Sequence, residues 1–115
     1  IYEQLIELLP TNYEYYYFAA TLSEEINLLD KAEAYFKKAI SINNDFALAI
    51  FGLGKTLRKK NCLSQSLEYF NKYKMLKPDD ANGFYNAGVI YDKLLKYSEA
   101  EINYRKAIEL NPNLP

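Results

Sequence analysis

The side chains of this sequence that could act as catalysts are pairs of neighbouring carboxylates. Glu24 and Glu25 form one pair, and Asp79 and Asp80 form another. Two carboxyl groups in different surroundings can share the roles of general acid and general base. The chain has no histidine and one cysteine, Cys62, so a Ser-His or Cys-His couple cannot be built and a metal site would lack its most common ligand. We therefore expect no catalysis, no metal and no other cofactor.

The elements expected around these groups give them structural roles. Both carboxylate pairs fall at helix ends or turns, where carboxylates are solvated or cap a helix. The stretch "FGLGK" contains Gly52 and Gly54 but follows no predicted strand, so it is a weak match to a phosphate-binding loop. We assign Gly54 to helix packing and expect Gly52 to tolerate alanine. A lone cysteine in a turn, Cys62, is interpreted as an inert thiol.

Composition narrows the classes of partner. The 115 residues are 50% hydrophobic and 25% charged, with a net charge of −1 and a pI of about 5.5. This balance suits a folded domain and gives no electrostatic reason to expect nucleic acid. No apolar run is long enough for membrane insertion, and no signal peptide is present in this sequence. We assign the chain to the cytoplasm by default.

The sequence repeats itself at a fixed interval. Residues 31–45, "KAEAYFKKAISINND", align with residues 99–113, "EAEINYRKAIELNPN", and a diverged third version occupies residues 65–79, midway between them. So many matches in one register indicate an array of stacked structural repeats. The sets of residues spaced by 34 include Tyr16, Ile50 and Phe84; Ala19, Leu53 and Ala87; Ala20, Gly54 and Gly88; and Asp30, Ser64 and Ser98.

Each repeat is predicted to hold two helices. Apolar spacings of three and four predict first helices over about 14–25, 48–60 and 82–94, and second helices ending near 42, 76 and 110. The second helices should begin at Asp30, Ser64 and Ser98, whose side chains can act as N-caps. Asn27 and Asn61 suit the turns between helices. Small residues on facing helices allow close approach, and large rings such as Phe36 and Phe70 fill the space between repeats.

These residues resemble the tetratricopeptide repeat family, whose pattern is W-x2-L-G-x2-Y, then A-x3-F-x2-A and a proline. The third repeat, 81–115, matches best, with its motif residues at Phe84, Ala87, Gly88, Tyr91, Ala100, Tyr104, Ala107 and Pro112. The other units are 13–46 and 47–80, and residues 1–12 are interpreted as the end of a preceding repeat, so we expect the chain to be a fragment of a longer protein. The resemblance implies an all-α, right-handed superhelical solenoid whose first helices line a concave groove.

The predicted function is protein–protein interaction, with a peptide or helix of a partner held in that groove. Tyr17, Phe51 and Tyr85 are spaced by 34 positions, and each follows a packing residue by one, which turns it about 100° toward the groove. We call these three side chains the groove rings. We expect Phe51, at the centre, to be an exposed ring. The hypothetical groove residues are Tyr17, Phe18, Phe51, Lys55, Asn82, Tyr85 and Asn86.

Alternatives remain open at two points. The groove rings could instead pack within the array, in which case these repeats would be a structural spacer or a self-association segment, with end-to-end contacts between copies. The cluster Lys55, Arg58, Lys59 and Lys60 could hold an acidic peptide, or it could pair with charges on neighbouring repeats such as Glu24. For the cluster we favour pairing, except at Lys55, whose register points further into the groove.

Overall fold

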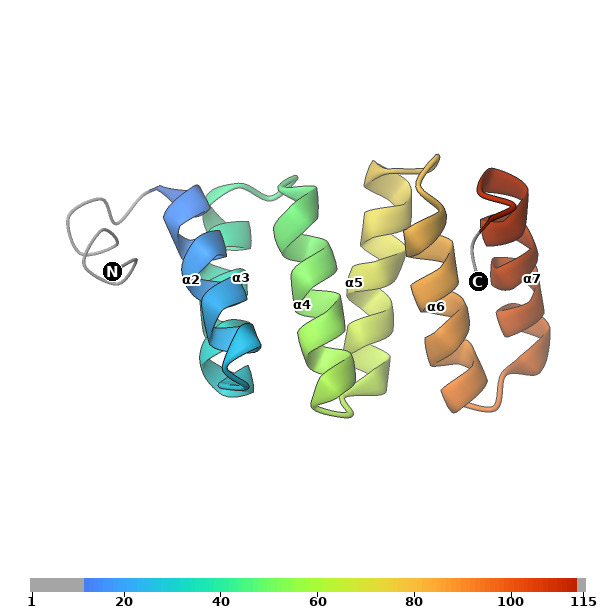
Figure 1. Cartoon of the computed structure of the whole chain (residues 1–115), viewed down its shortest axis with the longest axis horizontal. Helices are drawn as coiled ribbons and strands as arrows, with labels where there is room; N and C mark the ends of the chain where they lie inside the picture. The colour runs from blue at the N-terminus through green and yellow to red at the C-terminus, as the bar shows by residue number, and fades with distance from the viewer. Residues whose placement is uncertain (1–11, 114–115) are drawn as a thin grey trace.

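The computed structural model describes residues 12–113, and over this range the chain is a row of six helices without a strand (Figure 1). The prediction of an all-α repeat array is confirmed. The segment 1–11, which the sequence assigns to a preceding repeat, lies outside the described residues. The helices are α2 (Tyr13–Glu25), α3 (Leu29–Ile42), α4 (Ala47–Lys59), α5 (Leu63–Leu76), α6 (Ala81–Lys93) and α7 (Tyr97–Leu110).

The helices form three consecutive pairs, and each helix packs against the next one along the chain. Polar side chains also join helices of the same kind in successive pairs. Arg58 of α4 donates to the amide oxygen of Asn86 of α6 at 2.5 Å, and Lys74 of α5 donates to Asn103 of α7 at 2.8 Å. The first helices α2, α4 and α6 therefore form one side of the array, and the second helices α3, α5 and α7 form the other.

One large ring from each second helix organises the packing. These ring positions are Phe36, Phe70 and Tyr104, which share one register of the repeat. A Cβ added at Gly54 would lie 2.8 Å from the Phe70 ring, and one added at Gly88 would lie 2.8 Å from Tyr104. The two glycines therefore let the helices of a pair approach closely, as the sequence predicts.

The expectation that Gly52 tolerates alanine is wrong. A Cβ added at Gly52 would lie 2.5 Å from Cζ of Phe36, which belongs to the preceding repeat. Gly52 is buried where α4 meets α3, and the ring leaves no room for another carbon. Sequence periodicity places Gly54 against its own repeat but gives no signal for this second contact.

The turns inside the three repeats share one backbone conformation. Asn27, Asn61 and Leu95 have φ angles of 64°, 64° and 62°, in the left-handed region that ends many helices. After each of them, the next backbone N–H donates to the preceding helix, for example from Leu28 to the carbonyl of Ser23 at 2.8 Å. Asparagine tolerates this conformation better than leucine does, so the third turn carries strain that the first two avoid.

The predicted N-caps of the second helices are wrong. Asp30, Ser64 and Ser98 lie inside the first turns, because the helices begin at Leu29, Leu63 and Tyr97. The positive-φ residue reverses the chain so abruptly that the next helix starts without a side-chain cap. Side-chain caps occur instead on two first helices, where Asn12 accepts from Glu14 N–H at 3.0 Å and Asp80 accepts from Asn82 N–H at 2.9 Å.

Candidate functional site

The groove rings lie on the three first helices and are all half-buried. Each contacts the ring position of its own repeat: Tyr17 lies 6.0 Å from Phe36, Phe51 lies 5.6 Å from Phe70, and Tyr85 lies 5.9 Å from Tyr104, measured between ring centroids. Part of every groove ring is thus used in packing within its repeat, and part of it stays accessible to solvent. The rings are neither fully exposed nor fully consumed by packing.

Phe51, the central groove ring, has a second aromatic neighbour and a cation beside it. Its ring lies 4.8 Å from that of Tyr73, and the ammonium of Lys55 stands 5.3 Å from its centroid. A cation over an aromatic face is attracted by the electrons of the ring. Within residues 12–113, no carboxylate lies within 4 Å of the Lys55 ammonium. Lys55 is therefore able to meet a negative group without giving up an ion pair in that part of the chain.

A hollow of about 480 Å³ lies next to this centre, between the start of α4 and the end of α5. Tyr73, which contacts Phe51, forms part of its wall, Leu48 contributes an exposed apolar side chain, and Lys77 adds a second cation. The hollow can accept an apolar side chain beside Phe51. Its lining residues are Asp45, Phe46, Ala47, Leu48, Tyr73 and Lys77.

Tyr17, the first groove ring, has further aromatic neighbours. Its ring lies 5.2 Å from Phe46 and 5.6 Å from Phe18, which is itself exposed. Burial, and secondarily the negative charge of Glu24, raises the pKa of the Tyr17 hydroxyl. Sequence reasoning missed Phe46, because it lies in the connection between repeats rather than in the periodic positions of a helix.

The two asparagines predicted for the groove occupy different environments. Asn82 is exposed, whereas Asn86 is buried and its side-chain amide donates to the backbone carbonyl of Asn82 at 2.8 Å. The amide oxygen of Asn86 accepts from Arg58. Asn86 thus fixes the position of Arg58, while Asn82 lines a pocket at the start of α6.

Most side chains of the basic cluster are paired with groups on neighbouring repeats, as predicted from the sequence. Lys59 lies 3.4 Å from Glu24, confirming that predicted pairing. Lys60 contacts Asp30 at 2.6 Å and Glu33 at 2.5 Å, and these hydrogen bonds raise the pKa of Lys60. Arg58, Lys59 and Lys60 therefore join successive repeats, and Lys55 stands apart from them.

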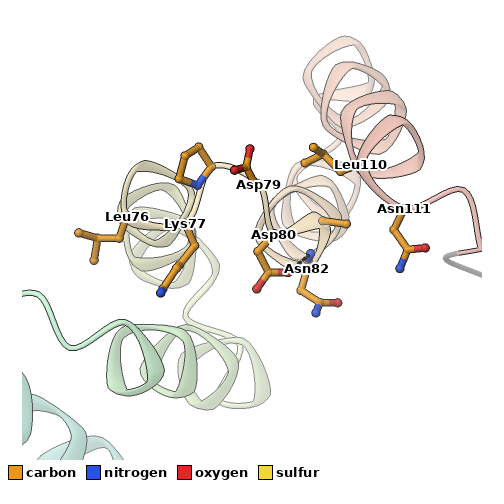
Figure 2. Close-up of a pocket in the computed structure, with 9 residues that line it drawn as sticks. Leu76, Lys77, Asp79, Asp80, Asn82, Leu110 and Asn111 are labelled. Atoms are coloured by element: carbon orange, nitrogen blue, oxygen red, sulfur yellow. Dashed lines mark hydrogen bonds between the residues drawn. The ribbon is translucent and has the colours of Figure 1, made fainter.

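One member of each carboxylate pair has structural partners. Glu24 accepts from the Thr56 hydroxyl at 2.6 Å, and Asp80 caps α6 while accepting from the Tyr73 hydroxyl. Burial, and then the hydrogen bond to Asp80, raises the pKa of Tyr73 to about 12. Figure 2 shows the Asp79 and Asp80 side chains pointing in different directions at a pocket of about 660 Å³. This arrangement assigns Asp80 to capping.

Metal-ligating clusters and membrane-spanning helices are both absent from residues 12–113. No group of three or more His, Cys, Asp or Glu side chains in this range is arranged to hold a metal ion. None of the described helices is both long and apolar enough to cross a membrane.

The array is similar to several solved structures. It superposes on MamA with a TM-score of 0.93 at 22% sequence identity, covering 96% of this chain and 65% of MamA. It superposes on YrrB with a TM-score of 0.87 at 26% identity, covering 97% of this chain and 58% of YrrB. YrrB is described as a tetratricopeptide repeat protein with an unusual peptide-binding site.

Curated relatives are much longer than this chain. Human protein O-mannosyl-transferase TMTC3 is 32% identical over 85 residues, which are 73% of this chain and 9% of the relative. Tmtc3 of Drosophila melanogaster is 31% identical over 103 residues, which are 89% of this chain and 11% of the relative. The chain thus spans about a tenth of the length of these relatives.

Two stretches match the sequence pattern of one family directly. Residues 13–46 and residues 81–114 each match the tetratricopeptide repeat. The helix pairs, the regular spacing of the repeats and the structural neighbours agree with these matches, and they indicate a protein-interaction module. The chain belongs to the tetratricopeptide repeat family.

Proposed function

We propose that this chain is a non-catalytic module that binds a peptide or helix of a partner protein along its first helices. The observation that carries the proposal is the row of half-buried groove rings, with Lys55 over the central one. Rings held by packing keep a fixed orientation, so a ligand binds their accessible part without having to order them. The peptide site named for YrrB supports a peptide as the ligand class.

The binding centre is Phe51. A ligand side chain that enters the hollow would contact Leu48 and Tyr73, whose ring packs on that of Phe51. Lys55 can then pair with a carboxylate of the ligand, and Asn82 can hydrogen-bond its backbone. Truncating a buried aromatic anchor of this kind often costs about 2 kcal/mol or more of binding free energy.

The test uses peptides selected from a random library against the intact chain. We expect Phe51→Ala to weaken their binding at least tenfold, and Lys55→Ala to weaken it severalfold. Because Phe51 packs on Phe70, its removal also lowers stability, so Lys55→Ala is the cleaner change. The matched controls are Tyr69→Ala, a half-buried ring on α5, and Lys106→Ala, a cation on α7. Equal losses in the controls would refute a groove site.

A second candidate function is a structural spacer or self-association segment. It is favoured by the contact that every groove ring makes with the ring position of its own repeat. This function predicts that Phe51→Ala lowers the melting temperature while binding to selected peptides, measured on the folded fraction, stays unchanged. Circular dichroism and a binding titration on the same sample separate the two functions.

A further inference from the structure

Two openings of the array occupy equivalent places, one repeat apart. The hollow beside Phe51 lies between the start of α4 and the end of α5, and its lining includes residues 45–48 and 77. The pocket of Figure 2 lies at the start of α6 and the end of α7, and its lining includes residues 79–82 and 111, which lie 34 positions later. We call them the middle hollow and the polar pocket. A ligand that follows the first helices would meet both.

The linings of the two openings differ in polarity. In the middle hollow, Phe46 and Leu48 stand in the register that Asp80 and Asn82 occupy in the polar pocket. Figure 2 shows the Asp80 carboxylate beside Asn82 at that pocket. An apolar side chain placed there would keep water from these groups without offering a hydrogen bond in return. An apolar side chain therefore prefers the middle hollow.

Tyr73 strengthens this preference, and it has no aromatic counterpart in the other repeats. Its register holds Ala39 in the first repeat and Ala107 in the third, and both alanines are buried. The Tyr73 ring is buried as well, lies 4.8 Å from the Phe51 ring and forms part of the wall of the middle hollow. The middle repeat thus carries a ring where its neighbours carry a small side chain.

Glycine at position 83 makes room for the Tyr73 ring. A Cβ added at Gly83 would lie 2.9 Å from Cδ2 of Tyr73. At the first boundary the same two registers hold Ala39 and Ala49, which are buried in one cluster. A pair of alanines at one boundary therefore corresponds to a tyrosine and a glycine at the other, and this exchange supplies the wall of the hollow.

The Tyr73 hydroxyl fixes the ring between the two openings. It donates to one carboxylate oxygen of Asp80, while the other oxygen accepts from the backbone N–H of Asn82 and caps α6. Asp80 belongs to the wall of the polar pocket. The ring is thus held by Asp80 at its hydroxyl and by Gly83 and Phe51 along its length.

We propose that Tyr73 is a specificity-determining residue that fixes the register of a peptide ligand, by favouring the middle hollow for the ligand's apolar anchor. This inference rests on the proposed function and adds the position of the ligand along the array. Specificity is a difference of affinities, here between two openings of one protein. Lys55 favours the same register, because Thr21 and Val89 stand in its place in the other repeats. The ligand is therefore a peptide with one apolar anchor and a nearby carboxylate.

The first test removes the ring while keeping a packing arrangement that the array already uses. Tyr73→Ala combined with Gly83→Ala installs the alanine pair of the first boundary. We expect this exchange to weaken the binding of peptides selected against the intact chain at least fivefold, measured on the folded fraction. Tyr73→Phe keeps the ring and should stay within about twofold of the parent affinity, as should Tyr69→Ala, a half-buried ring on the same helix.

The second test locates the ligand. A selected peptide carries a nitroxide at one end, and broadening of the amide signals in the NMR spectrum of the saturated protein shows which residues lie near it. Asn82→Leu gives the polar pocket the counterpart of Leu48, and alone it should leave one broadened patch, because Tyr73 still favours the middle hollow. Combined with the alanine exchange, it should add a second patch 34 positions away. A purely structural role of Tyr73 would lower the melting temperature without adding this patch.

The proposal is overturned if the alanine exchange binds with the parent affinity, or if Tyr73→Phe loses as much affinity as the exchange does. It is also overturned if the combined variant keeps a single patch, or if Asn82→Leu alone already gives two. Failure of the proposed function has a different signature, in which Lys55→Ala weakens binding no more than Lys106→Ala does. If Lys55→Ala weakens binding and the alanine exchange does not, the groove site stands and the role of Tyr73 falls.

Discussion

The boundary between α3 and α4 and the boundary between α5 and α6 share a geometry and differ in chemistry. In both, a buried phenylalanine fills the space between repeats, Phe36 at 1% exposure and Phe70 at 0%. The rim of the first boundary is ionic, where Lys60 contacts Glu33. The rim of the second is apolar at the same register, where Leu67 and Leu94 both pack against the cluster around Phe70. Lys74 crosses this boundary to donate to Asn103.

The comparison separates the residues that stabilise the array from the residues that determine which repeats can be neighbours. Burial of a whole ring contributes far more free energy than an exposed ion pair, so the ring positions hold the repeats together. The rim residues add little stability, but a mismatched pair would leave a charge against an apolar side chain. The two boundaries should therefore respond alike to ring changes and differently to changes of pH.

The largest loss of stability is expected from truncating the ring positions of the second helices. Phe36→Ala and Phe70→Ala should each lower the free energy of unfolding by about 3–5 kcal/mol, because each ring is enclosed by two repeats. Tyr104→Ala should cost clearly less, since within residues 12–113 only its own repeat packs on it and it is half-buried. Urea unfolding followed by circular dichroism measures all three. Equal losses for Tyr104 and Phe70 would contradict this difference in burial.

A smaller loss of stability is expected from adding a side-chain carbon at the first boundary. Gly52→Ala should destabilise the chain by about 1–3 kcal/mol, because the new Cβ would meet the Phe36 ring. Gly54→Leu and Gly88→Leu should cost at least as much inside their own repeats. Thermal unfolding of each variant against the parent gives the values. If Gly52→Ala melted at the parent temperature, the two helices would not be as close as described.

The contrast between Gly54 and Gly52 shows how far sequence alone reaches. Gly54 is predicted to pack because Ala20 and Gly88 share its register, and the periodicity reveals any feature that recurs in every repeat. Gly52 aligns with Phe18 and Asn86, so its role depends on one particular boundary. Such a local contact leaves no periodic signal.

The same limit applies to the candidate site. The register identifies the groove rings and separates Lys55 from its paired neighbours. It does not reveal that Phe51 packs on Phe70 and Tyr73, which makes it half-buried rather than exposed. The capping prediction is wrong because each second helix begins at the residue before the expected cap. Asp30, Ser64 and Ser98 are then the second helical residue rather than the N-cap.

A gain of stability is expected from a change inside one repeat that leaves both boundaries intact. Leu95→Asn should stabilise the chain by about 1 kcal/mol, because leucine is strained at φ 62° and asparagine occupies the equivalent turns. Leu95 is 69% exposed, so little packing is lost. Asn61→Leu is the reverse control and should destabilise. Combining Leu95→Asn with a boundary variant tests whether the two effects add, as they should for separate sites.

The smallest expected effect is a change in stability that depends on pH at the first rim but not at the second. Hydrogen bonds from Lys37 and Lys60 lower the pKa of Glu33, so its ionised form is favoured in the folded state. The resulting stabilisation is present above the ordinary pKa of about 4.5 and is lost as the pH falls through the lower folded-state value. Glu33→Gln should therefore lower stability at pH 7, by less than about 1 kcal/mol, and should have no effect once the parent carboxyl is protonated.

The matched variant for this comparison is Leu67→Met, which keeps the second rim apolar at the same register. Its effect on stability should be the same at neutral and acidic pH, because no titrating group is changed. Urea unfolding of both variants and the parent across the acidic range provides the comparison. A stability difference for Glu33→Gln that persists unchanged in acid would mean that shape, rather than the contact with Lys60, sets the first rim.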